Sequence, residues 1–277
     1  MIRGLIISMF LWAGAVAADQ KVITLASTTS TQNSGLYDQI LPLFEAQTGI
    51  RVNVVAVGTG QALRLGKNGD ADVLIVHHRP SEDAFVAAGF GVARRDVMVN
   101  DFVIVGPPQD PARVRQARSA AEAFAAVFSA QLPFVSRGDE SGTHLKEQEI
   151  WKAAALVPSG AWYREIGAGM GAALNMATVT GAYVLTDRGT WLSFGNKGEM
   201  ALLFEGDTTL DNPYGIILVN PARHPHVQIE FARILADWLT SEPGQKAIAD
   251  YRIDDQRLFC PTALPEFADG RCSRHLK

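Results

Sequence analysis

The chain has 277 residues, of which 47% are hydrophobic, and it carries a formal net charge of −4. This composition supplies enough apolar side chains for a core. The mild acidity argues against a nucleic-acid-binding protein, because such proteins are normally basic. There is no charged run, no low-complexity segment and no repeat at the spacing of solenoid proteins. The length fits one large domain or two lobes of ordinary size.

The first 17 residues have the pattern of a secretory signal peptide. Arg3 supplies a positive charge, residues 5–16 form an apolar run, and Ala15-Val16-Ala17 ends this run with a small-x-small cleavage pattern. The apolar run is too short to span a bilayer. We expect cleavage after Ala17 and export of the mature chain, most simply to a bacterial periplasm.

The chain has two cysteines, Cys260 and Cys272, and both lie close to the C-terminus. An even cysteine count in an exported chain predicts a disulfide, which would close a short loop and stabilise the tail by about 2–3 kcal/mol. A metal site is the alternative. It would need more ligands than these two thiols, and His275 is the only nearby histidine. We therefore expect neither a metal nor a cofactor.

The first third of the chain alternates between strand-like and helix-like segments. Apolar runs of strand length alternate with segments whose apolar residues recur at helical spacing, at residues 21–26, 36–47, 52–57, 61–67, 72–76 and 82–88. Such alternation predicts an α/β fold, with a mainly parallel sheet and helices on both of its faces. Ligands of such sheets bind at the carboxyl ends of the strands.

Two long apolar segments predict that the chain crosses between two lobes. Residues 97–105 are too long and too apolar for a loop, and residues 214–220 have the same character. We interpret them as crossover strands that lead into a second α/β unit and back. Lobe 1 is then discontinuous. The predicted boundaries are residues 18–100 with 219–277 for lobe 1, and residues 101–218 for lobe 2.

Three predicted strands end in turns that are rich in serine, threonine and glycine, and a helix follows each turn. Helix N-termini carry unpaired backbone N–H groups and a partial positive charge, which suits a small oxyanion. The third turn adds a guanidinium, whose planar fork can bind two oxygens of an anion. The candidate ligands from these turns are Thr28, Thr29, Ser30, Gly58, Thr59, Gly60, Arg137, Ser141, Gly142 and Thr143.

Each turn also has an ordinary structural interpretation. Serine, threonine and glycine are common N-cap residues, so a helix start alone explains any single turn. Asp139 and Glu140 lie inside the arginine turn, and a carboxylate that faced the anion would repel it. We expect both acids to point outward in the first turn of the helix, where negative charge is favourable, and Asp139 to orient Arg137.

Metal binding and hydrolysis are the alternatives to anion binding. His77 and His78 follow a strand, but adjacent strand residues point to opposite sides, so a structural or cleft-wall role is preferred to a metal site. A hydrolase would use Ser141 as nucleophile with His144. These residues lie three apart across a helix start, and the pattern Gly-x-Ser-x-Gly is absent around Ser141. We therefore expect a binding protein rather than an enzyme.

Several stretches of the chain have the letters and spacing of a known family. They are STTSTQNSGLYDQILPLFEAQTG (27–49), VVAVGTGQAL (54–63), GDADVLIVHH (69–78), VMVNDFVIVGP (97–107), FVSRGDESGTH (134–144), GMGAALNMA (169–177), YVLTDRGTWL (183–192) and EGDTTLDNPYGIILVNP (205–221). Together they resemble the periplasmic tungstate-binding proteins of ABC transporters, which have the type II periplasmic binding-protein fold. The resemblance implies a monomeric, two-lobed receptor that closes on tungstate and delivers it to a membrane permease.

The match to this family has two departures and one ambiguity. Ser27 replaces the usual first threonine and keeps a hydroxyl, and Val99 replaces a tyrosine of the crossover. The spacing from Arg137 to Thr143 is also similar to the anion loop of phosphate-binding receptors. The family resemblance therefore supports the binding of an oxyanion, but it leaves open which oxyanion binds.

Protonation and size predict which oxyanion would bind. Tungstate is a tetrahedral dianion without a proton at neutral pH, so its site should present donors and no facing carboxylate. Phosphate often keeps a proton, which a donor-only site leaves unpaired at a cost of about 1–3 kcal/mol. We expect this cost to exclude phosphate, and size to exclude sulfate. Molybdate is nearly isosteric with tungstate, and the sequence does not distinguish the two.

Overall fold

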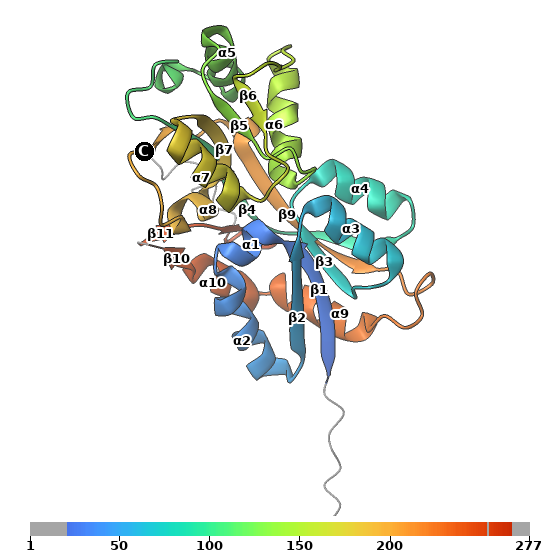
Figure 1. Ribbon diagram of the computed structural model, residues 1–277. Coiled ribbons are helices and arrows are strands. Elements are labelled where there is room, and N and C mark those ends of the chain that lie inside the picture. Colours follow the sequence, from blue (N-terminus) through green and yellow to red (C-terminus); the bar gives the residue numbers. More distant parts are fainter. Residues whose placement is uncertain (1–20, 254, 268–277) are drawn as a thin grey trace, which may run out of the picture.

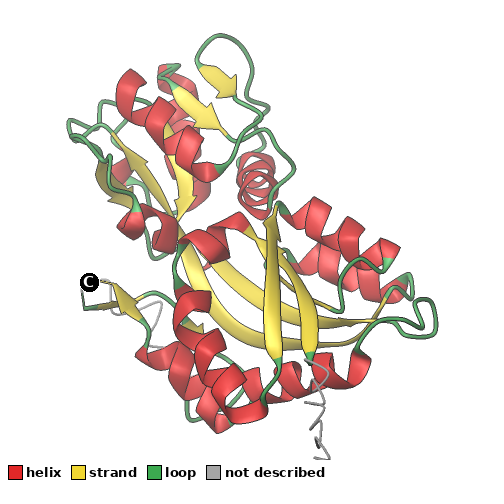
Figure 2. Cartoon of the chain, turned by 60° about the horizontal axis from the view of Figure 1, so that its bottom comes forward, coloured by secondary structure: helices red, strands yellow, loops and turns green. Residues whose placement is uncertain are grey.

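The computed structural model describes residues 21–253 and 255–267. The predicted signal peptide lies outside these residues. The chain folds into two lobes, one above the other in Figure 1, and strands of both lobes belong to a mixed ten-stranded sheet. Helices flank the strands in each lobe (Figure 2), as the predicted α/β fold requires. A helix long and apolar enough to cross a membrane is not found among the described residues.

Lobe 1, the lower one in Figure 1, contains three parallel strands at one edge of the sheet. They are β1 (Val22–Thr28), β2 (Arg51–Val57) and β3 (Val73–Val76), with β1 in the middle. The helices of this lobe are α1 (Thr29–Asn33), α2 (Leu36–Thr48), α3 (Thr59–Asn68), α4 (Arg79–Ala87), α9 (Ile229–Leu239) and α10 (Glu242–Asp250). Helices α3 and α4 begin earlier than predicted, because Gly58 and His78 are their N-caps.

Lobe 2, the upper one, repeats this plan with shorter strands. Its parallel strands are β5 (Phe134–Ser136), β6 (Tyr163–Glu165) and β7 (Tyr183–Asp187), with β5 in the middle. Its α-helices are α5 (Ala120–Ala130), α6 (Gly142–Ala153), α7 (Met170–Thr180) and α8 (Arg188–Ser193). The remaining elements are the short helices η1 (Val114–Gln116) and η2 (Thr208–Leu210) and the strand β8 (Ala201–Phe204).

Two long strands join the lobes. β4 (Gly91–Gly106) and β9 (Asp211–Val219) pair with each other in antiparallel orientation and lie between β3 of lobe 1 and β7 of lobe 2. The polar Asn100 lies within β4, and its Oδ1 accepts a hydrogen bond from Asn212 Nδ2 on β9 at 2.7 Å. The sheet is therefore more mixed than predicted, since each lobe adds antiparallel crossover strands to its parallel ones.

The C-terminal segment returns to the crossover. It forms the small hairpin β10 (Arg252–Ile253) and β11 (Gln256–Arg257), and then β12 (Cys260–Pro261), which pairs with β4. Cys260 faces Val99 in this pairing. Cys272, its expected partner, lies outside the described residues, so the disulfide between them stays a prediction.

Each lobe has hydrophobic cores of its own. Phe44 and Ile216 belong to the largest cluster of lobe 1, whereas Phe124 and Phe134 belong to one in lobe 2. All four side chains are fully buried. Because the cores are separate, the lobes can move as units about the two crossover strands.

A buried ion pair fixes the turn that leads from β3 into α4. Glu82 is fully buried, and its Oε2 accepts a hydrogen bond from Arg94 Nε at 2.6 Å. Its Oε1 accepts one from the backbone N–H of His78 at 2.8 Å. Burial raises the pKa of Glu82, and the neighbouring guanidinium of Arg94 opposes that rise. The pair therefore holds the end of β3, where His77 and His78 lie.

Removing the arginine of this pair should destabilise lobe 1. We expect Arg94→Met to lower the free energy of unfolding by about 3–5 kcal/mol, because a buried carboxylate loses its counter-charge. Arg95→Met is the matched control, since Arg95 pairs with Asp237 at the surface and should contribute at most about 1 kcal/mol. Urea denaturation of both variants measures the difference. Equal losses would contradict the structural role of the buried pair.

Candidate functional site

A small cavity lies between the lobes, beside the ends of β1, β2, β3 and β5. It is lined by Thr28, Thr29, Ser30, Val57, Gly58, Thr59, His77, Arg137, Ser141 and Gly142. It encloses only about 150 Å³ of empty space, so a drug-sized molecule does not fit between these residues. The cavity therefore suits a small ion. Eight of the ten predicted ligands line it, and Gly60 and Thr143 do not.

The turn after β1 brings several hydroxyl groups together. Thr28 is the N-cap of α1, and its Oγ1 accepts a hydrogen bond from the backbone N–H of Thr31 at 3.3 Å. The same oxygen lies 3.0 Å from Ser30 Oγ and 2.7 Å from Thr31 Oγ1. The capping interpretation of this turn is thus confirmed. It is compatible with a ligand role, because Thr29 and Ser30 also line the cavity.

The start of α3 offers donors that the protein leaves unused. Gly58, its N-cap, has no side chain to accept from the N–H groups of the first turn, which includes Gly60. Within the described part of the chain, the buried Oγ1 of Thr59 has no hydrogen-bond partner. Leaving such a group unpaired costs about 1–3 kcal/mol. A ligand that accepts hydrogen bonds would remove this cost.

Arg137 is the cation of the cavity. It follows β5, it is 4% exposed, and its Nη2 donates a hydrogen bond to Asp139 Oδ2 at 2.6 Å. Asp139 Oδ1 accepts from the backbone N–H of Ser141 at 3.2 Å, so one carboxylate orients both the arginine and the start of α6. This agrees with the role expected for Asp139. Arg137 Nε is buried and has no partner among the described residues, and no carboxylate lines the cavity.

The N-terminus of α6 completes the lobe 2 side. Ser141 is its N-cap, and its Oγ accepts from the backbone N–H of His144 at 3.2 Å. Thr143 Oγ1 is buried and, within the same described residues, also lacks a hydrogen-bond partner. Thr59, Arg137 and Thr143 therefore supply unpaired buried groups from both lobes. The ring of His144 does not accept the hydroxyl proton of Ser141, as a base would, since its Nδ1 accepts from the backbone N–H of Glu140 at 3.1 Å and its Nε2 lies 3.1 Å from Gln148 Nε2.

His77 is the residue of the cavity wall that the ligand prediction missed. It directly follows β3, is 5% exposed, and stacks on Tyr214 with ring centroids 4.8 Å apart. Its Nε2 lies 3.3 Å from Ser30 Oγ, and its Nδ1 lies 2.8 Å from Asn212 Oδ1. Burial lowers the pKa of His77 to about 4, with a further contribution from Arg137. The ring is therefore neutral at pH 7.

Comparison with known proteins identifies the family. A model of the PBP superfamily domain matches residues 15–243. The structure of the tungstate ABC transporter from Geobacter sulfurreducens is 52% identical, covers 83% of this chain and 98% of that chain, and has a TM-score of 0.78. The tungstate-binding protein TupA of Peptoclostridium acidaminophilum is 46% identical over 87% of this chain and 86% of that protein. The chain belongs to the family of periplasmic tungstate-binding proteins.

A second family structure supports the same assignment. The tungstate-binding protein TupA from Desulfovibrio alaskensis G20 is 43% identical, covers 88% of this chain and all of that chain, and has a TM-score of 0.77. The family resemblance expected from the sequence is thereby confirmed. Since the family consists of substrate-binding proteins of ABC transporters, the expectation of a binding protein rather than an enzyme also holds.

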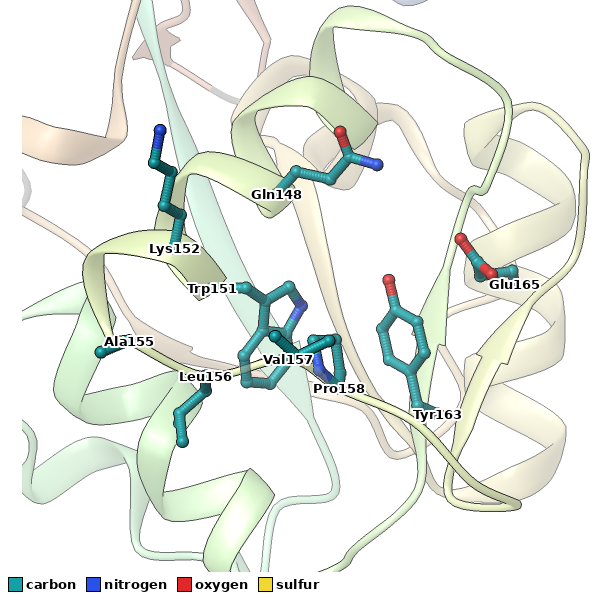
Figure 3. Close-up of a pocket in the computed structure, with 9 residues that line it drawn as sticks. All are labelled: Gln148, Trp151, Lys152, Ala155, Leu156, Val157, Pro158, Tyr163 and Glu165. Atoms are coloured by element: carbon teal, nitrogen blue, oxygen red, sulfur yellow. The ribbon is translucent and has the colours of Figure 1, made fainter.

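A larger hollow on lobe 2 has a mostly apolar wall. Its empty volume is about 830 Å³, and it lies beside α6 and β6, where the rings of Trp151, Pro158 and Tyr163 form much of its wall (Figure 3). The polar atoms of two of these rings are already used. Trp151 Nε1 and Tyr163 Oη both donate to Glu147 Oε1, at 3.2 and 2.7 Å. The cleft cavity therefore remains the candidate site of this family member.

Gly142 is required by the close approach of the lobes. A Cβ at this position would lie 2.6 Å from His77 Cε1 and 3.1 Å from Thr59 Oγ1. We expect Gly142→Ala to weaken tungstate binding at least about tenfold, or about 1.4 kcal/mol, because the lobes can no longer close fully. The unliganded protein should keep its thermal unfolding temperature.

Gly171→Ala is the matched control for this variant. A Cβ at Gly171 in α7 meets nothing within 4 Å, so tungstate affinity should stay at the wild-type value. Calorimetric titration of both variants gives the comparison. Wild-type affinity in Gly142→Ala would mean that the anion does not depend on this contact between the lobes.

Proposed function

We propose that this protein captures tungstate as a free dianion between its two lobes and delivers it to the permease of an ABC transporter. The observation that carries the proposal is the pair of unpaired buried groups at one cavity, Thr59 Oγ1 from lobe 1 and Arg137 Nε from lobe 2. A tetrahedral oxyanion that only accepts hydrogen bonds satisfies both. Family membership supports tungstate as this anion, because the relatives are named for it.

The proposed binding site combines charge, helix N-termini and hydroxyl groups. Arg137 supplies the positive charge, and α1, α3 and α6 direct their N-termini to the anion. Each charge-assisted hydrogen bond contributes about 1.5–3 kcal/mol. The proposed ligands are the ten residues predicted from the sequence, with Gly60 acting through its backbone and Thr143 through its hydroxyl.

Several features of the whole protein belong to the same proposal. The signal peptide at residues 1–17 is removed on export, and the mature protein acts in the periplasm as a monomer. Residues 18–100 with 219–277 form lobe 1, and residues 101–218 form lobe 2. Closure about β4 and β9 then brings Arg137 onto the turns of lobe 1.

Selectivity follows from protonation and size. The absence of a carboxylate among the residues that line the cavity leaves a protonated phosphate without a strong acceptor. His77 Nε2 lies 3.3 Å from Ser30 Oγ. The serine hydroxyl therefore occupies this nitrogen, which is not available as an acceptor for a protonated phosphate. Sulfate is smaller than tungstate and leaves donors unpaired. Molybdate, nearly isosteric, is expected to bind in the same way.

Competitive calorimetry on the mature protein tests this function. We expect one tungstate per chain, molybdate of comparable affinity, and sulfate and phosphate weaker by more than tenfold. Arg137→Ala should weaken tungstate binding by at least about 2 kcal/mol, the scale of a lost charge-assisted contact. Arg164→Ala is the control, because the exposed side chain of Arg164 on β6 bonds only the carbonyl of Ala161 among the described residues.

Three outcomes would contradict the proposal. Phosphate within tenfold of tungstate would remove the protonation argument. Unchanged affinity in Arg137→Ala would remove the arginine from the site. The absence of any binding heat with tungstate would refute the receptor function itself.

A further inference from the structure

A chain of hydrogen bonds runs from the anion cavity to the crossover strands. Ser30 Oγ lies 3.3 Å from His77 Nε2, and His77 Nδ1 lies 2.8 Å from Asn212 Oδ1. Asn212 Nδ2 donates to Asn100 Oδ1 at 2.7 Å. Asn100 and Asn212 face each other across β4 and β9 where the chain passes between the lobes. The cavity and the hinge therefore share one continuous buried hydrogen-bond chain.

The direction of each bond in this chain follows from its neighbours. Because the amide nitrogen of Asn212 donates to Asn100 and lies 3.3 Å from Tyr214 Oη, the amide oxygen of Asn212 faces His77. That oxygen can only accept, so His77 carries its proton on Nδ1. In the neutral ring Nε2 is then an acceptor, and the hydroxyl of Ser30 must donate to it.

This arrangement conflicts with a bound dianion. A hydroxyl has one proton to donate. Tungstate only accepts hydrogen bonds, so when Ser30 turns its proton toward the anion, His77 Nε2 loses its donor. The nitrogen is then a buried acceptor with a lone pair facing Ser30 Oγ, which is unfavourable. Protonation of Nε2 removes the conflict, because the new N–H donates to Ser30 Oγ and Ser30 donates to the anion.

We propose that His77 takes up a proton at Nε2 from the solvent when the anion binds, and that Asn212 is the positioning residue which holds the ring in the tautomer that makes this possible. The inference rests on the proposed function and deepens it. The affinity for tungstate then depends on pH through His77, and Asn212 on the crossover strand β9 decides which nitrogen of the ring takes up the proton.

The charges around His77 decide the sign of the pH dependence. Burial disfavours the imidazolium most, and Arg137 from lobe 2 and the neighbouring His78 add to this effect, so the pKa of the ring is lowered to about 4. Tyr214 beneath the ring stays neutral, because burial raises its pKa far above the usual range. A dianion in the cavity opposes these effects and raises the pKa of His77 in the bound state.

The linkage therefore predicts tighter binding at lower pH. With a pKa that is higher in the complex than in the empty protein, affinity rises as the pH falls through the bound-state value and levels off near pH 4. We expect wild-type protein to bind tungstate at least about threefold more tightly at pH 5.5 than at pH 7.5. Tryptophan fluorescence titration measures this, with tungstate at low micromolar concentration so that it stays monomeric.

Two substitutions test the linkage in opposite ways. His77→Gln keeps a polar group near the position of Nε2 but cannot titrate, so the pH dependence should disappear. Asn212→Asp places a carboxylate 2.8 Å from Nδ1, which raises the pKa of the ring and should shift the inflection to higher pH. A purely structural role of Asn212 would lower affinity equally at every pH and leave the inflection in place.

His78→Gln is the matched control. His78 Nε2 lies 3.3 Å from Glu149 Oε1, an ion pair between α6 and the start of α4 when the histidine is protonated. His78 is the neighbouring histidine and does not line the cavity, so affinity should still rise at low pH in this variant. If the dependence vanishes in His78→Gln and survives in His77→Gln, the proposal is wrong and this contact at the cleft rim is the source.

Nitrogen NMR of the labelled imidazole gives an independent reading. Before tungstate is added at pH 6, the ring nitrogens of His77 should report a neutral ring with the proton on Nδ1, and saturation should convert it to the imidazolium. A ring that stays neutral in the complex, or a pH-independent affinity, would overturn the inference while tungstate binding itself stands. A protein that binds no tungstate at any pH would refute the proposed function instead.

Discussion

The rest of the site depends on the buried ion pair between Arg137 and Asp139. Asp139 holds one of the arginine nitrogens and also the first backbone N–H of the turn into α6. The Nε of Arg137 is buried and has no hydrogen-bond partner among the described residues. A guanidinium that is fixed in this way cannot turn toward the solvent to form hydrogen bonds there. A ligand that accepts a hydrogen bond from its Nε therefore gains the full free energy of that bond. The same applies to the hydroxyl of Thr59, which also lines the cavity.

The fold explains why these groups meet. Parallel strands in each lobe direct their carboxyl ends, and the helix N-termini that follow them, toward the space between the lobes. The crossover strands β4 and β9 then set two such edges against each other (Figure 1). Gly142 allows the start of α6 to lie close to lobe 1, since the Cβ of any larger residue would clash with the ring of His77. The proposed receptor therefore needs two lobes, because neither lobe alone supplies all of the donors.

Much of this site could be predicted because its residues follow strands directly. The turns at Thr28, Gly58 and Arg137 each come after an apolar run, and topology alone places such turns at one edge of a sheet. His77 follows β3 in the same way and carried the same signal. The sequence alone indicates only a wall residue, because the role of His77 depends on Asn212, which lies 135 residues away in the sequence. Local patterns contain no information about that pairing.

The strand directions were harder to predict than the strand positions. A run such as 97–105 indicates a buried strand, but not that it pairs with β9 in antiparallel orientation, because that pairing joins segments more than a hundred residues apart. Helix starts at Thr59 and Arg79 were placed too late, since glycine and histidine are less distinctive N-caps than serine or aspartate. The strand pairing is decided by a tertiary contact, whereas the helix starts depend on N-caps that the local sequence marks only weakly.

Crystallography of the mature protein with tungstate tests the central claim most directly, because tungsten can be located by its anomalous scattering. We predict one strong peak between the lobes. Its oxygens should lie about 2.7–3.2 Å from Arg137 Nε, Thr59 Oγ1 and Thr143 Oγ1. A peak on the surface of one lobe, or one in the cleft without contact to Arg137, would contradict the account.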